Sequence, residues 1–166
     1  MILGMSTANF TLVHVVLSLV GIVTGLVVLR GMFAAQRLAG WTAVFLATTI
    51  LTSITGFCFP TATFDPAKVF GVISLLALAA AVIALYACRL AGAWRWIYVV
   101  GAVLALYLNC FVAVVQAFQK LPVLQPLAPT QSEPPFQIAQ GVVLVLFIVL
   151  GIVAARRFHP ERGSPA

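Results

Sequence analysis

One histidine, His14, stands inside a long apolar run, residues 9–29, in which every other side chain is uncharged. An imidazole ring can take up a proton near neutral pH, donate or accept a hydrogen bond, or ligate a metal. Ionisable groups are costly in apolar surroundings, and those retained there are commonly functional. The alternative is a neutral ring that hydrogen-bonds a threonine or glutamine of a neighbouring helix. The sequence leaves both interpretations open.

Other strongly hydrogen-bonding side chains recur near the same end of the apolar runs. At a helical rise of about 1.5 Å per residue, most of them lie within ~10 Å of that end, with Asn109 nearer the middle. Buried polar groups need partners, so we expect these side chains to face one another or a small water-filled recess. The predicted pocket consists of His14, Thr52, Thr55, Asn109, Gln116 and Gln140.

Residue sets for common kinds of catalysis do not occur in these runs. No run contains a carboxylate, which argues against a proton or cation pump driven by Asp or Glu. The second histidine, His159, stands near the C-terminus, so one chain does not supply two haem ligands. We find no zinc or di-iron ligand set, no nucleotide motif and no nucleophile–base–orienter set. We therefore expect no catalytic residue, no metal and no cofactor, and the sequence favours a non-enzymatic role.

The three cysteines, Cys58, Cys88 and Cys110, form no CxxC pair, and each lies in or at the end of an apolar run. A disulfide framework or a thiol-redox enzyme would need paired cysteines at one membrane face. We therefore interpret them as small apolar packing residues.

Five apolar runs must position all these groups: 9–29, 41–59, 69–88, 96–118 and 136–155. Each holds roughly 20 residues, the length of a helix that crosses a ~30 Å hydrocarbon core. Hydrophobic residues make up 63% of the 166-residue chain and charged residues only 7%, with a mean hydropathy of +1.17. A soluble domain carries about 25% charged residues. The sequence thus predicts an all-α transmembrane bundle of five helices, one domain over 1–158, and a flexible cytoplasmic tail over 159–166.

Basic residues predict the orientation, because cytoplasmic loops carry an excess of Lys and Arg. Seven stand on one side and two on the other, which predicts an outer N-terminus and a cytoplasmic C-terminus. They are scattered singly, so the net charge of +6 suits anionic lipid headgroups better than nucleic acid. The two sets are Arg30, Arg37, Arg89, Arg95, Arg156, Arg157 and Arg162, against Lys68 and Lys120. The expected interfacial aromatic belt on the arginine side is Trp41, Tyr86, Trp94, Trp96 and Tyr98.

Local signals mark where helices begin on the other side. Ser6 or Thr7 suits a cap for the first run, and Asp65-Pro66 a cap and first position for the third. Thr130 to Glu133 fits a capping box before the fifth run, with Ser132 as an alternative cap. The segment 119–135 contains five prolines. It is interpreted either as a stiff, extended connector or as a lid or docking surface.

Small and polar residues recur at three- and four-residue spacing on each run, which is typical of helix-packing faces. Gly21 and Gly25 form a GxxxG motif that lets helix backbones approach closely, within the chain or across a homodimer. The other faces include Ser18 on the first run; Thr48, Thr49, Thr52, Ser53 and Thr55 on the second; and Ser74, Ala77, Ala81 and Ala84 on the third.

Four segments carry a resemblance: TSITGFCFP at 52–60, AGAWRWIYVV at 91–100, ALYLNCF at 105–111 and APTQSEPPF at 128–136. Together they resemble an uncharacterised group of small bacterial multi-pass inner-membrane proteins, over most of the chain. The resemblance implies a bacterial plasma membrane and implies no activity.

These observations favour a non-enzymatic accessory or binding protein. Its expected partners are the lipid bilayer and either a second copy or a partner membrane subunit, without nucleic acid. A small transporter or carrier with an outward-facing polar pocket is the alternative. A quinone- or lipid-binding redox protein, with His14 at the headgroup site, is the second alternative.

Overall fold

The computed structural model describes residues 2, 4–60 and 66–160. Within them the chain forms five long helices and no strand: α1 (Thr7–Phe33), α2 (Ala39–Phe57), α3 (Pro66–Val82), α4 (Trp94–Lys120) and α5 (Pro134–Arg157). A π-helical turn, η1 (Ile83–Ala87), continues α3, and a 3₁₀ turn, η2 (Gln125–Leu127), lies between α4 and α5. The predicted all-α fold is confirmed, and all five helices are long and apolar enough to cross a membrane.

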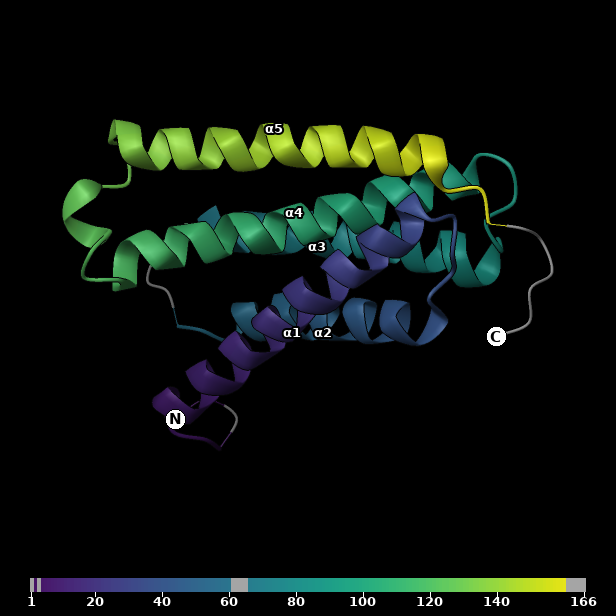
Figure 1. Ribbon diagram of the computed structural model, residues 1–166. Coiled ribbons are helices and arrows are strands. Elements are labelled where there is room, and N and C mark those ends of the chain that lie inside the picture. The colour runs from purple at the N-terminus through teal and green to yellow at the C-terminus, as the bar shows by residue number, and fades with distance from the viewer. Residues whose placement is uncertain (1, 3, 61–65, 161–166) are drawn as a thin grey trace.

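The helices coincide closely with the apolar runs. The second predicted run extends two residues beyond Phe57, where α2 ends, and the others lie within a helix or end one residue beyond its last turn. The start of α1, the end of α2 and the connection from α4 to α5 lie at one end of the bundle (left in Figure 1), and the end of α5 lies at the other. Large apolar side chains on all of these helices are exposed, as hydrocarbon surroundings permit.

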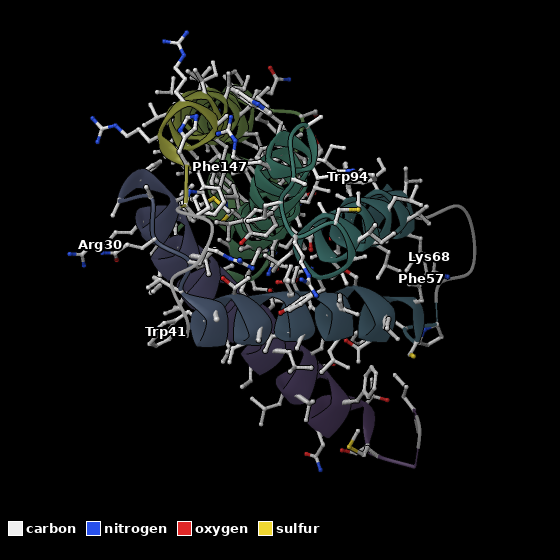
Figure 2. All side chains as sticks on the ribbon, turned by 90° about the vertical axis from the view of Figure 1, so that its right-hand side faces the viewer. Arg30, Trp41, Phe57, Lys68, Trp94 and Phe147 are labelled. Atoms are coloured by element: carbon white, nitrogen blue, oxygen red, sulfur yellow. The ribbon has the colours of Figure 1, made fainter. Side chains whose placement is uncertain are left out.

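Helix α4 is the centre of the bundle. It contacts α1, α2, α3 and α5, and 50% of its most apolar stretch is buried, against 33% or less for the other helices. α1 crosses the bundle obliquely, and α5 lies along the outer side of α4 (Figure 1). Phe147 of α5 points inward and is almost completely buried (Figure 2).

Small residues bring α4 close to its neighbours. A Cβ atom on Gly101 of α4 would lie 2.6 Å from the carbonyl oxygen of Ala77 and 3.2 Å from the Cβ of Ala81, both in α3. A Cβ atom on Gly25 of α1 would lie 2.6 Å from Leu106 of α4. The GxxxG glycines therefore face other helices of the same chain. Gly101 had not been singled out from the sequence.

The ends of the helices differ in part from the expected caps. The Ser6 cap is confirmed, because its Oγ accepts a hydrogen bond from the Asn9 N–H at 3.2 Å. Asp65 lies outside the described residues. The capping box is wrong: α5 begins at Pro134, after Glu133, and no side chain caps it. The reason is that Pro134 and Pro135 offer no N–H to a capping group.

The Glu133 carboxylate instead closes a turn ahead of α5. It accepts hydrogen bonds from the Thr130 N–H and hydroxyl, at 3.1 and 2.8 Å, and from the Ser132 N–H at 3.1 Å. Desolvation raises the pKa of the Glu133 carboxyl, but these hydrogen bonds lower it more, so its pKa lies below the ordinary value. The expected extended connector is wrong for this loop, because Leu121 to Ala128 forms successive turns and Ala128 is buried.

Tyr98 does not belong to the exposed aromatic belt. Trp41, Tyr86, Trp94 and Trp96 are exposed, but Tyr98 is buried, and its ring lies 5.7 Å from that of Phe158. The expectation for Tyr98 is wrong because it begins the buried face of α4, four residues before Ala102.

Arg95 fastens the end of α5 to the start of α4. Its Nη1 donates hydrogen bonds to the carbonyl oxygens of Ala155, at 3.0 Å, and Phe158, at 2.6 Å. These carbonyls lie where a helix leaves its last acceptors unpaired and carries partial negative charge. The guanidinium carbon also lies 4.6 Å from the centre of the Trp96 ring, in cation–π geometry.

We predict that Gly101→Ala lowers the free energy of unfolding in detergent by about 1–3 kcal/mol, because the added methyl group collides with the α3 backbone. The matched control is Gly141→Ala on α5, where an added Cβ meets no atom within 4 Å. Thermal unfolding of both variants measures the difference. Equal stability of the two would contradict the close approach of α3 and α4.

Candidate functional site

A cavity of about 110 Å³ lies between α1, α2, α3 and α4, in the half of the bundle that contains the start of α1. Phe57, the last residue of α2, and Lys68, at the start of α3, both line it, and they lie on the same side of the bundle in Figure 2. Polar side chains share the other walls with apolar ones, among them Phe70, Leu108 and Val112. The polar residues that line the cavity are His14, Ser18, Thr49, Thr52, Ser53, Lys68, Ser74 and Asn109.

His14 is held by Thr55 of α2. The His14 Nδ1 lies 2.8 Å from the Thr55 Oγ1. We assign the Thr55 hydroxyl proton to the carbonyl oxygen of Leu51, 2.7 Å away in the same helix, and the Nδ1–H of His14 to the Thr55 oxygen. A neutral ring in this tautomer keeps Nε2 as a hydrogen-bond acceptor. The edge-on ring of Phe59, 5.2 Å away, helps to fix the imidazole orientation.

Asn109 of α4 and Ser18 of α1 form a reciprocal pair. The Ser18 hydroxyl donates to the Asn109 Oδ1 at 2.7 Å, and the Asn109 Nδ2 donates to the Ser18 carbonyl oxygen at 3.3 Å. Gly21 makes room for this pair, since a Cβ atom there would lie 3.1 Å from the Asn109 Nδ2. The pair ties the first half of α1 to α4 and leaves one amide hydrogen of Asn109 for another acceptor.

Ser53 and Ser74 join α2 to α3 across the cavity. Their hydroxyl oxygens lie 3.2 Å apart, and Ser53 also donates to the carbonyl oxygen of Thr49 at 3.0 Å. Ser74 is buried, so its hydroxyl depends on this contact or on the contents of the cavity.

Two further hydroxyl groups in the cavity wall are unpaired. The Oγ1 atoms of Thr49 and Thr52 are buried and have no hydrogen-bond partner within the described parts of the chain. A buried hydroxyl without a partner costs roughly 1–3 kcal/mol. Both oxygens are enclosed by the helices in this structure, so a molecule in the cavity would bond to them only after a rotation of the threonine side chains.

The structure brings together part of the predicted pocket. His14, Thr52 and Asn109 line the cavity, and Thr55 hydrogen-bonds His14 from the adjoining turn of α2. Gln116 is exposed and does not line it. The oblique path of α1 carries its N-terminal end away from the end of α4, where Gln116 stands (Figure 1).

Gln140 lies between α5 and α4 rather than in the cavity. Its Nε2 donates to the carbonyl oxygen of Phe111 at 3.1 Å, and its Oε1 has no partner among the described residues. The side chains that line the cavity come from α1 to α4. The expectation that Gln140 shares a pocket with His14 followed from depth alone, and depth does not specify which neighbour a helix faces.

Sequence reasoning treated several cavity residues as packing groups. Ser18, Thr49, Ser53 and Ser74 appeared in the helix-packing faces, and Lys68 only in the charge count. A usable signal was the helical register of α1, where His14 and Ser18 are four residues apart and share one face. The corresponding register of α2 places Thr49 and Ser53 together.

The cavity is suited to hydrogen bonding. Hydroxyl groups donate and accept, the imidazole of His14 accepts, the amide of Asn109 donates, and Lys68 adds a cation at the edge. Over the residues that the structure describes, no three His, Cys, Asp or Glu side chains gather as a metal site. The three cysteines are free thiols.

Comparisons of the chain with protein-family models, with curated proteins and with solved structures find no match. The described residues by themselves define a helical protein with five apolar helices compatible with several membrane crossings. The feature that distinguishes it within that class is the cavity enclosed by α1, α2, α3 and α4, with its hydrogen-bonding side chains.

We predict an energetic coupling of about 0.6–1.7 kcal/mol between Ser18 and Asn109, from the average to the maximum measured for hydrogen bonds between membrane helices. A double-mutant cycle of Ser18→Ala and Asn109→Ala, read by thermal unfolding in detergent, measures it. The same cycle between Ser18→Ala and Gln140→Ala is the control and should give a coupling near zero. Additive effects in both cycles would mean that the pair contributes nothing to stability.

Proposed function

We propose that this protein is a multi-pass membrane protein that binds a small polar molecule without changing it chemically. The molecule would occupy the cavity that α1, α2, α3 and α4 enclose. The observation that carries the proposal is the set of hydrogen-bonding side chains that line the cavity from four helices, among them His14, Ser53 and Asn109. The ligand is expected both to donate and to accept hydrogen bonds, because hydroxyl groups and the Nε2 of His14 offer both roles.

The volume of the cavity supports a ligand larger than a single water. A bound water needs about 10–15 Å³ of free volume, and the free volume of the cavity is about 110 Å³. The volume accommodates several waters or one small organic molecule. Since the polar groups come from four helices, a ligand that bridges them also stabilises their arrangement.

The packing beyond the cavity favours binding over transport. Toward the other half of the bundle, Gly25 of α1 fits tightly against Phe45 of α2 and Leu106 of α4, and all three are buried. This apolar contact leaves only about 10 Å³ of free space between the helices below the cavity. A carrier needs a second arrangement in which this contact opens, whereas a binding protein does not. A quinone site would need a longer apolar slot beside His14.

The proposed orientation has the N-terminus outside and the C-terminus in the cytoplasm, with the cavity in the outer half. It is supported by seven basic residues on one side against two on the other. The odd number of described helices agrees with the start of α1 and the end of α5 lying at opposite ends of the bundle (Figure 1). The resemblance of segments such as 52–60 and 105–111 supports a bacterial inner membrane as the location.

If the binding protein acts as an accessory subunit, α5 is the helix that contacts a partner membrane subunit or a second copy of this chain. α5 is the least buried of the described helices and exposes apolar side chains along most of its length. Binding in the cavity would then report the ligand to that partner through α4, which contacts both the cavity and α5.

We predict that a reporter active only in the cytoplasm works when fused after Arg157, and that one active only outside works when inserted at Gln125. The excess of basic residues on the Arg157 side is the physical reason. Activity assays of both reporters at both positions give the answer. Reversed activities would invert the orientation, and the same side for both positions would rule out α5 as a span.

We predict that Thr52→Val lowers the thermal stability of protein extracted in mild detergent by about 2–4 °C, the effect of ~1 kcal/mol. Valine keeps the shape of threonine but loses the bond to the ligand. If the hydroxyl were truly unpaired, its removal would raise stability instead, so the sign decides. The control is Thr48→Val, whose hydroxyl donates to its own helix at Val44.

Native mass spectrometry of the same preparations tests the ligand directly. The wild-type protein should retain a small-molecule adduct, and Thr52→Val and His14→Phe should lose it while they stay folded. An adduct that is missing from the wild type, together with a rise in stability for Thr52→Val, would refute the binding role.

A further inference from the structure

A second, quite different site lies on the lipid-facing side of the bundle, between the start of α4 and the end of α5. It is a groove of about 460 Å³ with almost entirely apolar walls. Its α4 side runs from Trp96 to Tyr107, and its α5 side from Leu144 to Arg156. Gly151 leaves room between the helices, and Phe147 forms part of the floor. The polar cavity of α1 to α4 shares no lining residue with it.

The length of the groove matches one leaflet of a bilayer. Tyr107 follows Trp96 by 11 residues and Arg156 follows Leu144 by 12, so at ~1.5 Å per residue the groove is about 17–18 Å long. Half of a ~30 Å hydrocarbon core is ~15 Å. The groove therefore extends from one membrane surface to about the midplane and stops there.

Only one end of the groove carries a charged side chain, and Tyr107 lies at the other end. Arg156 and Trp96 stand at the charged end, and both side chains are exposed. Tryptophan prefers the headgroup level of a membrane. The neighbouring Arg95 is engaged with the carbonyl oxygens of Ala155 and Phe158, so the cation facing the groove is Arg156.

We propose that this groove binds an anionic phospholipid, with one acyl chain between α4 and α5 and the phosphate paired with Arg156. The apolar walls suit the chain, the length suits a single leaflet, and the cation lies where the headgroup begins. Basic residues near the membrane surface attract anionic headgroups. A helix of a second copy fits less well, because it would run along the full length of α4 and α5, whereas the groove ends at Tyr107 and Leu144.

The test is native mass spectrometry of the full-length protein in detergent, titrated with dioleoylphosphatidylglycerol and, separately, with dioleoylphosphatidylcholine. The wild-type protein should bind the anionic lipid about five-fold more tightly, the contribution expected of one basic residue at the surface. Arg156→Gln should reduce its affinity to that of the zwitterionic lipid. Arg157→Gln is the control, because Arg157 does not line the groove.

A groove-filling variant tests the acyl-chain part separately. Val100 lines the groove and is largely exposed, so Val100→Trp should fold and should weaken the binding of both lipids. Val145→Trp places the same bulk on an exposed part of α5 outside the groove and should leave binding unchanged. Equal affinity for the two lipids, no effect of Arg156→Gln or Val100→Trp, or a lipid-free dimer that Val100→Trp abolishes would overturn the proposal.

Discussion

Polar groups between apolar helices must find partners within the protein, and the arrangement of α1 to α5 depends on this constraint. The outer surfaces of the helices are as apolar as the lipid around them, so burial of apolar area does not by itself select neighbours. The selection comes from a few cross-helix contacts: Ser18 with Asn109, Ser53 with Ser74, and Gln140 with the Phe111 carbonyl. Each joins a different pair of helices, and two of the three involve α4.

Close backbone approach and hydrogen bonding support each other in this fold. Gly21 lets α1 come near enough to α4 for the Ser18–Asn109 pair to form, and Gly101 lets α3 press against α4 on another side. Because these side chains are short, free space remains where Thr52, Ser53 and Ser74 meet. The cavity is thus a consequence of small polar residues on four converging helices. One turn further along, Phe45 and Leu106 fill most of the equivalent space and leave only about 10 Å³ free.

The sequence was sufficient for the helices and for part of the site. Apolar runs of about 20 residues permit little except membrane helices, and the depth of His14, Thr52 and Thr55 placed them in one zone, with Asn109 nearer the middle. It was insufficient where the direction of a side chain matters. Gln116 stands two turns after Asn109 on the same face of α4, yet the oblique path of α1 leaves it exposed (Figure 1). Tyr98 looked like a surface aromatic residue because its burial depends on the position of Phe158, 60 residues away.

Arg95 shows why charges counted from a sequence have more than one role. The count used for orientation treats the seven arginines as equivalent, but Arg95 binds the last carbonyl oxygens of α5 and stacks over Trp96. It therefore stabilises the contact of α4 with α5 and shapes the end of the groove between them. Removing it from the count leaves six basic residues against two, so the orientation signal survives. The remaining arginines near that end, Arg156 above all, are then available to the membrane surface.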